Sequence, residues 1–155
     1  MTHLKDKLIG IGKIKNGDVI EIFQSEKITE SIAYSFFLKV FADVIEDGLA
    51  LQFTNMNPSQ YSAIYAVLDK TILGIMTYHI IIEKKTTIIK LSSVEKKHRN
   101  QGIYSILFQS LEKISIEKEV SHIISWIHKK NTVSLISAEK TGRFPEYVVM
   151  GKRIS

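Results

Sequence analysis

The sequence lacks several features that whole classes of protein require. It has no cysteine, so disulfides, thiol nucleophiles and thiolate zinc sites are excluded. Its five histidines form no HExxH pair, and we expect no metal cofactor. His79 and the charged residues 83–85 interrupt the longest apolar run, so no segment predicts a membrane span. The first residues, MTHLKD, do not resemble a signal peptide, and we expect a cytoplasmic protein.

The composition that is present predicts one domain with an uneven charge distribution. Hydrophobic residues make up 45% of the 155 residues, so residues 1–155 are treated as a single domain with a full core. Residues 1–79 hold seven Lys+Arg and nine Asp+Glu, whereas residues 80–155 hold fourteen and seven, giving net charges of −2 and +7. Such a basic half indicates either a polyanionic partner or a solvated surface rich in lysine.

The first half of the chain predicts a hairpin, a helix and then strands. In KIKNGDVIEI, Asn16-Gly17 is typical of a type I′ turn between two alternating strands. Ser25 is the expected cap of a helix whose apolar residues recur every four positions from Ile28 to about Ile45. Segments rich in β-branched and aromatic residues predict three consecutive antiparallel strands, at residues 61–68, 72–82 and 86–94.

The second half switches to a helical period and then alternates. Apolar residues on one face predict a helix over residues 102–117, and a strand is expected at 122–127. Asn131 can cap a helix that reaches Lys140, with Gly142 at its C′ position. Residues 147–154 are expected to close the chain as a strand. This order of elements predicts an α+β or mixed α/β fold in layers.

One basic stretch, KKHRNQGIYSIL at residues 96–107, gathers positive charge at the point where a helix begins. The first N–H groups of a helix have no internal partner, and its dipole makes that end positive, so it binds phosphate well. Arg99 adds a planar donor group, and Gly102 lets the backbone approach a ligand closely. The stretch therefore predicts a pyrophosphate cradle, and the alternative is a solvated loop. No P-loop motif GxxxxGK(S/T) is present.

Two motifs in this half resemble those of the GNAT family of N-acetyltransferases. Residues 94–104 resemble motif A, in which Arg or Gln precedes a Gly-x-Gly or Gly-x-Ala after a strand ending in Val. Residues 131–144 resemble motif B, Asn-x-x-Ala/Ser followed by Tyr-Glu-Lys-x-Gly-Phe. The resemblance covers residues 61–144 and rests on element order before that. It departs from the family at Tyr104, which replaces Gly or Ala, at Ala138, which replaces the tyrosine, and at the inserted Arg143.

The resemblance implies a central mixed, mostly antiparallel β-sheet flanked by helices. Acetyl-CoA would lie where the strands at residues 86–94 and 121–127 splay apart. Backbone near Ser92 and Val94 would pair with the pantetheine arm, and Asn131 would contact the cofactor from the other side. The implied pyrophosphate ligands are the backbone amides of Arg99, Asn100, Gln101, Gly102, Ile103 and Tyr104.

The family precedent is direct transfer of the acetyl group to a bound amine, which needs a base and a proton donor for the leaving thiolate. His79 is the candidate base, directly or through water, and the alternative is a packed or surface histidine. Ser137 neighbours the vacant tyrosine position and is the first candidate donor, although a helix serine often bonds its own backbone. Tyr78 and Tyr104 are further candidate donors, and the alternative for Tyr78 is cross-strand packing. Trp126 is expected to fill the core beside the sheet.

The sequence therefore predicts an acetyl-CoA-dependent N-acetyltransferase that acts on a primary amine, first of a small molecule such as an amino acid, amino sugar or polyamine. A protein amine is the second choice. A CoA-binding module with little catalysis is an alternative, because Ala138 replaces the tyrosine. A nucleic-acid-binding protein is suggested only by the basic half, and the sequence has no RNP-type aromatic motif. We expect no nucleic-acid or membrane partner, and a monomer or homodimer.

Overall fold

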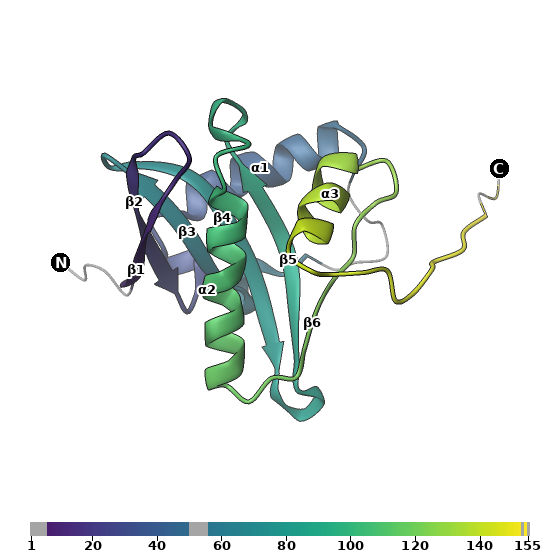
Figure 1. Cartoon of the computed structure of the whole chain (residues 1–155). Helices are drawn as coiled ribbons and strands as arrows, with labels where there is room; N and C mark the ends of the chain where they lie inside the picture. Colours follow the sequence, from purple (N-terminus) through teal and green to yellow (C-terminus); the bar gives the residue numbers. More distant parts are fainter. Residues whose placement is uncertain (1–5, 50–55, 153, 155) are drawn as a thin grey trace.

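A computed structural model of the chain describes residues 6–49, 56–152 and 154. Within them, a six-stranded sheet carries helices on both faces (Figure 1). None of the described helices is long and apolar enough to cross a membrane. The strands are β1 Lys7–Lys13, β2 Val19–Ser25, β3 Ser62–Leu68, β4 Thr71–Ile81, β5 Thr86–Val94 and β6 His122–Ser125. The helices are α1 Tyr34–Glu46, α2 Ile103–Glu117 and α3 Thr132–Lys140, and the single 3₁₀ turns are η1 Ile28–Glu30, η2 Pro58–Gln60, η3 Ile82–Lys84 and η4 Lys96–His98.

The strands lie in the sheet in chain order, from β1 to β6. Every neighbouring pair is antiparallel except β5 and β6, which are parallel. A parallel pair needs a crossover connection, and here α2 supplies it across one face of the sheet. The expected mixed, mostly antiparallel sheet flanked by helices is therefore confirmed.

Two hydrophobic clusters cover the two faces of the sheet. On one face, Phe37 and Val40 of α1 pack with Tyr65 and Ile75 of the strands. On the other face, Ile103, Leu107 and Leu111 of α2 pack with Met76 and Tyr78. Adjacent strand residues feed opposite clusters because side chains alternate along a strand. Burying one such large side chain contributes about 1.5–3 kcal/mol, so both helices are held firmly on the sheet.

The hairpin between β1 and β2 forms where expected, but its turn is not type I′. Ile14 N donates to Asp18 O over 3.0 Å and Gly17 N donates to Ile14 O over 2.9 Å, so the loop has three residues. Gly17 has a φ of +97°, and Asn16 has no positive φ, whereas type I′ requires two. Asn16 Oδ1 instead accepts a hydrogen bond from Asp18 N at 2.9 Å, which stabilises the longer loop.

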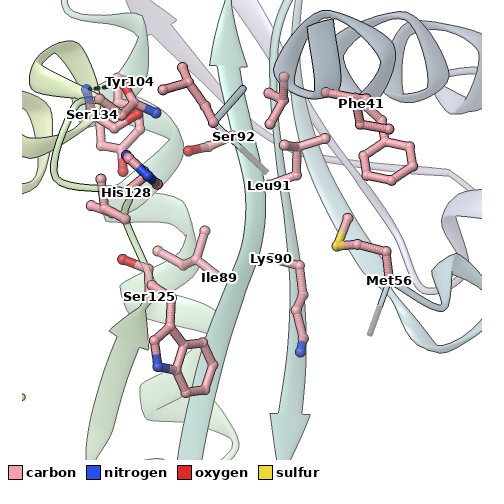
Figure 2. Close-up of a pocket in the computed structure, with 16 residues that line it drawn as sticks. Phe41, Met56, Ile89, Lys90, Leu91, Ser92, Tyr104, Ser125, His128 and Ser134 are labelled. Carbon is pink, nitrogen blue, oxygen red and sulfur yellow. Dashed lines mark hydrogen bonds between the residues drawn. The ribbon is translucent and has the colours of Figure 1, made fainter. Parts of the chain in front are cut away.

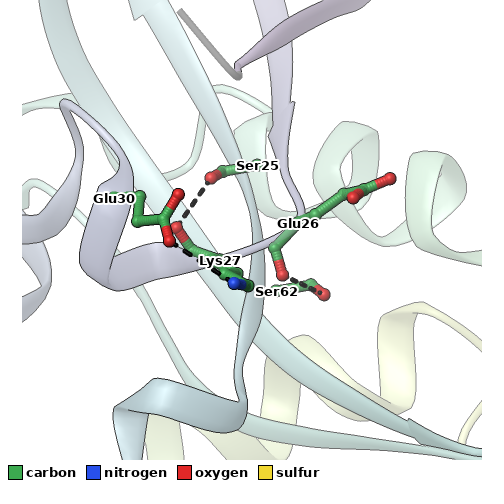
Figure 3. A network of polar contacts seen from close by, with 5 residues as sticks. All are labelled: Ser25, Glu26, Lys27, Glu30 and Ser62. Atoms are coloured by element: carbon green, nitrogen blue, oxygen red, sulfur yellow. Dashed lines mark hydrogen bonds and ion pairs between the residues drawn. The ribbon is translucent and has the colours of Figure 1, made fainter. Parts of the chain in front are cut away.

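The prediction that Ser25 caps a helix is wrong, because α1 begins only at Tyr34. Ser25 is the buried last residue of β2, and its Oγ donates to Lys27 O over 3.0 Å (Figure 3). In the same turn, Ser62 Oγ donates to the carbonyl of Glu26 over 3.0 Å. These bonds hold the chain as an irregular turn against β3, and a helix from Ser25 would break them.

A buried carboxylate, Asp6, organises the start of α1. Asp6 Oδ2 accepts hydrogen bonds from Ser31 Oγ at 2.7 Å, Ile32 N at 3.3 Å and Tyr65 OH at 2.7 Å. Ser31 Oγ in turn accepts from Ala33 N at 3.0 Å. Burial, together with the Asp6 carboxylate, raises the pKa of Tyr65, so its phenol stays a donor. The network places Ile32 at the surface, 63% exposed, although its spacing predicted a buried position.

The predicted closing strand at residues 147–154 is also wrong. Residues 147–152 and 154 lie outside any strand, and Tyr147 is 83% exposed. The chain meets the edge of β6 earlier, where Arg143 Nη1 donates to Ser125 Oγ over 2.8 Å and Glu146 Oε1 lies 2.8 Å from His122 Nε2. β6 ends at Ser125 rather than at residue 127, so its two end residues, His122 and Ser125, already contact residues 143–146. No residue of β6 is then left to pair with a strand at 147–154.

Candidate active site in the cleft between β5 and β6

The pairing of β5 and β6 ends halfway along β5. Their register runs from Thr86↔His122 to Ile89↔Ser125, and β5 then continues to Val94. Beyond Ile89, no described strand pairs with that edge of β5, because the chain turns away towards α3. Unpaired backbone N–H and C=O groups of a strand edge can bind another extended chain. The expected splay of these two strands is therefore present.

A cavity of about 320 Å³ occupies this opening and is lined by sixteen residues (Figure 2). One of these residues, Lys90, is positively charged. The apolar members are Phe41, Val44, Ile45, Leu49, Met56, Ile89, Leu91, Trp126 and Ile127. The polar members are Ser92, Tyr104, Ser125, His128, Asn131 and Ser134. In Figure 2, Ser92, Tyr104 and His128 lie on one side of β5, and Phe41 and Met56 lie on the other. The cavity thus wraps around the free edge of β5 and joins a polar side to an apolar side.

The N-terminus of α2 lies at the end of this cleft and has no side-chain cap. Gly102 is the residue before the helix and has a φ of +88°, in the left-handed region that favours glycine. No side chain accepts a hydrogen bond from the first turn of α2. A Cβ added to Gly102 would meet no atom within 4 Å, so that side of the loop is open. The uncapped amides and the open space are what an anion-binding helix terminus requires.

The loop before α2 is held in place by its own side chains. Arg99 Nε donates to Val94 O over 3.0 Å, which closes the turn from β5. Gln101 accepts from the β1–β2 loop twice, from Lys15 N through its carbonyl at 3.1 Å and from Asn16 N through Oε1 at 3.0 Å. The carbonyl of Val94 and the side chain of Gln101 are therefore already engaged within the protein. The amide of Arg99 also donates within the chain, to Lys96 O, so what remains for a ligand is the backbone amides from Asn100 onwards.

Arg143 joins three elements behind the cleft. Gly142, with a φ of +81°, sits at the expected C′ position of α3, and Arg143 N bonds Ala138 O at 3.2 Å in a Schellman motif. The guanidinium donates to Tyr104 OH and, over 2.8 Å, to Ser125 Oγ. It also lies 4.9 Å from the centre of the Phe108 ring. The inserted arginine thus fixes the phenol of Tyr104 and holds α3 against β6 and α2.

Lys90 occupies a β-bulge in β5. Thr77 pairs with Leu91 and the next residue of β4 pairs with Ile89, so Lys90 is the extra residue. Bulges redirect a side chain, here into the cavity. Its Nζ lies 5.7 Å from the centre of the Tyr61 ring and 5.9 Å from that of Trp126. Burial raises the pKa of the Tyr61 phenol, so that ring stays neutral and supplies no counter-charge.

His128 is, like Lys90, a residue of the cavity that was not predicted from the sequence. Its Nδ1 accepts a hydrogen bond from Lys130 N at 3.1 Å, which assigns the proton of the neutral ring to Nε2. His128 O accepts from Asn131 N at 2.8 Å, so the loop before α3 is closed on both sides of the histidine. With its proton on Nε2, His128 is a potential hydrogen-bond donor among the residues that line the cavity. No signal in the sequence indicated His128, because the strand before it was expected to reach residue 127 and ends at Ser125.

The predicted site residues are only partly brought together. Ser92, Tyr104 and Asn131 line the cavity, and Asn131 Oδ1 also caps α3 by accepting from Ser134 N at 3.2 Å. Asn100, Gly102 and Ile103 lie in or next to the loop that starts α2. The two predicted catalytic residues, His79 and Ser137, are not among the lining residues.

The surroundings of His79 and Trp126 differ from the expectation. Nδ1 of His79 lies 3.1 Å from Gln60 O, a contact with the chain just before β3. Trp126 is not in the core as predicted, because β6 ends before it, and it lies 42% exposed at the cavity. Among the described residues, no group of three or more His, Cys, Asp or Glu side chains could hold a metal ion.

The acetyltransferase (GNAT) family model matches residues 18–142. A search of curated proteins gave no match. Among solved structures, the fold is similar to an aminoglycoside acetyltransferase, meta-AAC0020, from an uncultured soil metagenomic sample in complex with sisomicin, with a TM-score of 0.67 and 16% identity over 88% of this chain and 95% of that chain.

Two further solved structures are similar. A ribosomal-protein-alanine N-acetyltransferase from Brucella melitensis biovar Abortus 2308 has a TM-score of 0.66 and 14% identity over 88% of this chain and 99% of that one. The aminoglycoside N-acetyltransferase AAC(6')-Iy in complex with CoA has a TM-score of 0.63 and 16% identity over 86% and 99%. At these identities the structures show the shared fold, whereas the family model covers most of the chain. This chain belongs to the acetyltransferase (GNAT) family.

Proposed function

We propose that the protein transfers an acetyl group from acetyl-CoA directly to a primary amine of a small molecule. The observation that carries this proposal is the opening of the sheet at Ile89↔Ser125, with the uncapped N-terminus of α2 at its end. Family membership makes acetyl transfer the chemistry to expect, and the named neighbours act on small aminoglycosides and on a protein amine. The cavity, at about 320 Å³, suits a small ligand better than a protein surface.

The residues present fit the cofactor. A diphosphate needs several N–H donors in a positive field, and residues 100–104 offer uncapped amides at the N-terminus of α2, whereas the amide of Arg99 already donates to Lys96 O. The pantetheine arm contains amide groups, and the unpaired edge of β5 around Ser92 offers backbone partners for them. Because Val94 O is bonded to Arg99, the free part of that edge is shorter than the sequence predicted. Asn131 would contact the cofactor through the amide nitrogen that its cap leaves unused.

The reaction proposed is a single displacement. When bound, acetyl-CoA supplies an acetyl group activated as a thioester. A bond forms between the amine nitrogen and the acetyl carbon, the carbon–sulfur bond breaks, and the thiolate takes up a proton. Since the chain has no cysteine, an acetyl-cysteine intermediate is impossible. Unpaired N–H groups of β5 would stabilise the negative charge that develops on the carbonyl oxygen.

Proton transfer in the cleft is assigned to the groups that line it. Ala138 cannot donate a proton to the thiolate, whereas Tyr104 and His128, which both carry a donor group, line the cavity. Tyr104 accepts its bond from Arg143, so its own hydroxyl proton is free to be donated. Among the described residues no carboxylate lines the cavity, so the proton of the acceptor ammonium leaves to water, with His79 remaining a predicted base outside the cavity lining.

A screen of amines with acetyl-CoA, read by release of free thiol, tests the proposal. We expect turnover with a small primary amine, intersecting double-reciprocal lines, and a kcat/KM that rises with pH as the amine loses its proton. Parallel lines, or an isolable acetylated protein that passes its acetyl group to the amine, would contradict direct transfer.

The same screen separates the alternatives. CoA binding without turnover of any amine identifies a binding module, which the buried Ala138 in place of a donor would favour. Turnover of a peptide amine alone identifies a protein acetyltransferase. The expected cytoplasmic location and the monomeric or homodimeric state stay predictions.

A further inference from the structure

The cavity contains one uncompensated positive charge. Of the lining residues that the structure describes, Lys90 is the only Lys or Arg, and none is Asp or Glu. Lys90 forms no ion pair within the part of the chain that the structure describes. The remaining residues, 1–5, 50–55, 153 and 155, include no acidic side chain in the sequence. No side-chain carboxylate of this chain is therefore assigned to Lys90.

The surroundings of Lys90 make that charge available to a ligand. It is half-buried, and its Nζ lies 5.7 Å from the centre of the Tyr61 ring and 5.9 Å from that of the Trp126 ring. Aromatic rings stabilise a cation without neutralising it. An ammonium held beside apolar walls interacts more strongly with an anion than one in open water, because the local dielectric constant is lower. Lys90 is the extra residue of the β-bulge, and it is among the residues that line the cavity.

The position of Lys90 places the charge on the acceptor's side of the cleft. The proposed cofactor contacts lie on the side of β5 with Ser92, Tyr104 and Asn131. Lys90 and Leu91 lie on the other side of β5, the side on which Phe41 and Met56 lie (Figure 2). If the cofactor occupies the polar side, the acceptor meets an apolar wall with a single cation.

This arrangement argues against a polycationic acceptor. A polyamine or aminoglycoside carries several ammonium groups, and such ligands need carboxylates to replace their hydration. The cavity lining offers none, and Lys90 would repel them. The same like-charge effect favours the neutral, nucleophilic form of one amine bound nearby, in a cavity whose lining holds no carboxylate base.

We infer that the acceptor is a small primary amine that carries a carboxylate and an apolar body, as an apolar amino acid does, and that Lys90 pairs with the carboxylate. This inference names the acceptor and rests on the proposed function for the site. The apolar body contacts the wall formed by α1 and Met56. The amine, which is the other end of the same small molecule, is then left to face the free edge of β5.

A binding experiment tests the inference without requiring turnover. Trp126 is the only tryptophan of the chain and lines the cavity, so its fluorescence reports on ligands there. N-acetyl-L-leucine and N-acetyl-L-leucinamide are product-like probes that differ in the carboxylate alone. We expect the acid to bind the native protein about tenfold more tightly than the amide, which is the scale of one hydrogen bond to a charged group. In Lys90→Gln the two affinities should become equal through a loss for the acid.

The control is Lys84→Gln, which removes the same charge from the exposed turn before β5. It should leave the preference for the acid unchanged, and circular dichroism should show that both variants are folded. Equal binding of acid and amide by the native protein, or an equal loss of both in Lys90→Gln, overturns the inference.

A kinetic arm separates this inference from the proposed function. With acetyl-CoA, L-leucine should have a higher kcat/KM than L-leucinamide or spermidine, and Lys90→Gln should raise KM for L-leucine more than it lowers kcat. A preference for spermidine or an aminoglycoside overturns the acidic acceptor and leaves the acetyltransferase intact. Failure to acetylate any amine overturns the proposed function, and with it the inference, whatever the probes show.

Discussion

β5 has a neighbour on each side, and the two pair with it over different lengths. Towards β4, the register covers the whole strand, from Gly74↔Val94 to Ile81↔Thr86. Towards β6, it stops at Ile89↔Ser125. The first side builds the sheet and the second leaves the cleft, so one strand provides both stability and a ligand site. Substitutions on the two sides should therefore separate folding from binding.

The largest effect is expected at the open end of the cleft. Gly102→Val places a β-branched residue at a φ of +88°, which costs about 1–2 kcal/mol or forces the loop to move. Either result removes amides from the proposed phosphate site. We expect CoA affinity to fall about a hundredfold, on the order of 3 kcal/mol, by calorimetry.

Gly48→Val is the matched control for that variant. Gly48 also has a positive φ, +67°, and a Cβ there would meet no atom within 4 Å, but it follows α1 instead of preceding α2. It should lose stability without losing CoA affinity. If a folded Gly102→Val protein binds CoA as the native protein does, the cofactor does not lie at this loop.

On the fully paired side, Gly74→Val should damage folding more than binding. A Cβ at Gly74 would lie 3.1 Å from Ser93 O and 3.2 Å from Val94 Cγ2, so β4 and β5 would have to separate. Overpacking of this kind costs about 2 kcal/mol, measured by denaturant unfolding. Gly10→Val on β1 meets no atom within 4 Å and should change stability by less than about 0.5 kcal/mol. If Gly74→Val and Gly10→Val lost the same unfolding free energy, the close contact at Gly74 would not destabilise the sheet.

Substitutions at Arg143 test how much its hydrogen bonds to Tyr104 and Ser125 contribute to the cleft. Arg143→Met removes the hydrogen bonds to Tyr104 and Ser125 while keeping an apolar side chain over Phe108. We expect a loss of about 1 kcal/mol in unfolding free energy and a higher KM for acetyl-CoA. Arg143→Lys keeps the charge but loses the planar guanidinium, so it should restore only part of the unfolding free energy and only part of the low KM for acetyl-CoA. An unchanged KM in Arg143→Met would show that the position of Tyr104 does not matter to the cofactor.

The smallest effects are expected for the two residues that the sequence suggested as catalytic. His79 and Ser137 do not line the cavity, so His79→Ala and Ser137→Ala should lower kcat by about two- to threefold without abolishing it. A general base or acid contributes about 10²–10⁴-fold, and steady-state kinetics distinguishes the two ranges readily. A loss in kcat of that larger size would show that the residue acts as a general base or acid.

Local patterns were enough to predict most elements of the fold. The strands β3 to β5 and the helix α2 follow the apolar period, and the caps at Asn131 and Gly142 follow from residue type. The start of α1 could not be predicted, because it depends on Asp6, which is distant in the sequence and reaches Ser31 only in the folded protein. Periodicity reports which face is apolar, but it does not report where a strand loses its partner.

The site was predictable in outline for the same reason. The glycine and basic residues before α2 are adjacent in the sequence, and they lie beside a pair of strands whose pairing stops at Ile89↔Ser125, while their role towards a cofactor stays a prediction. Lys90, His128 and Arg143 were missed as parts of the site because a bulge, an early strand end and a Schellman turn direct them. None of these three features leaves a repeating signal.

The order of the strands also has a consequence for how the molecule assembles and opens. β3, β4 and β5 are joined by short turns, whereas β6 reaches β5 only after the chain has crossed the sheet through α2. Closing that longer loop for a pairing of only four residues makes β6 a late and weakly held addition. Amide protons of Ile123 and Ile124 should therefore exchange with solvent faster than those of Ile75 and Met76. A ligand that bridges β5 and β6 would slow exchange in β6 first, so binding itself would complete the cooperative unit.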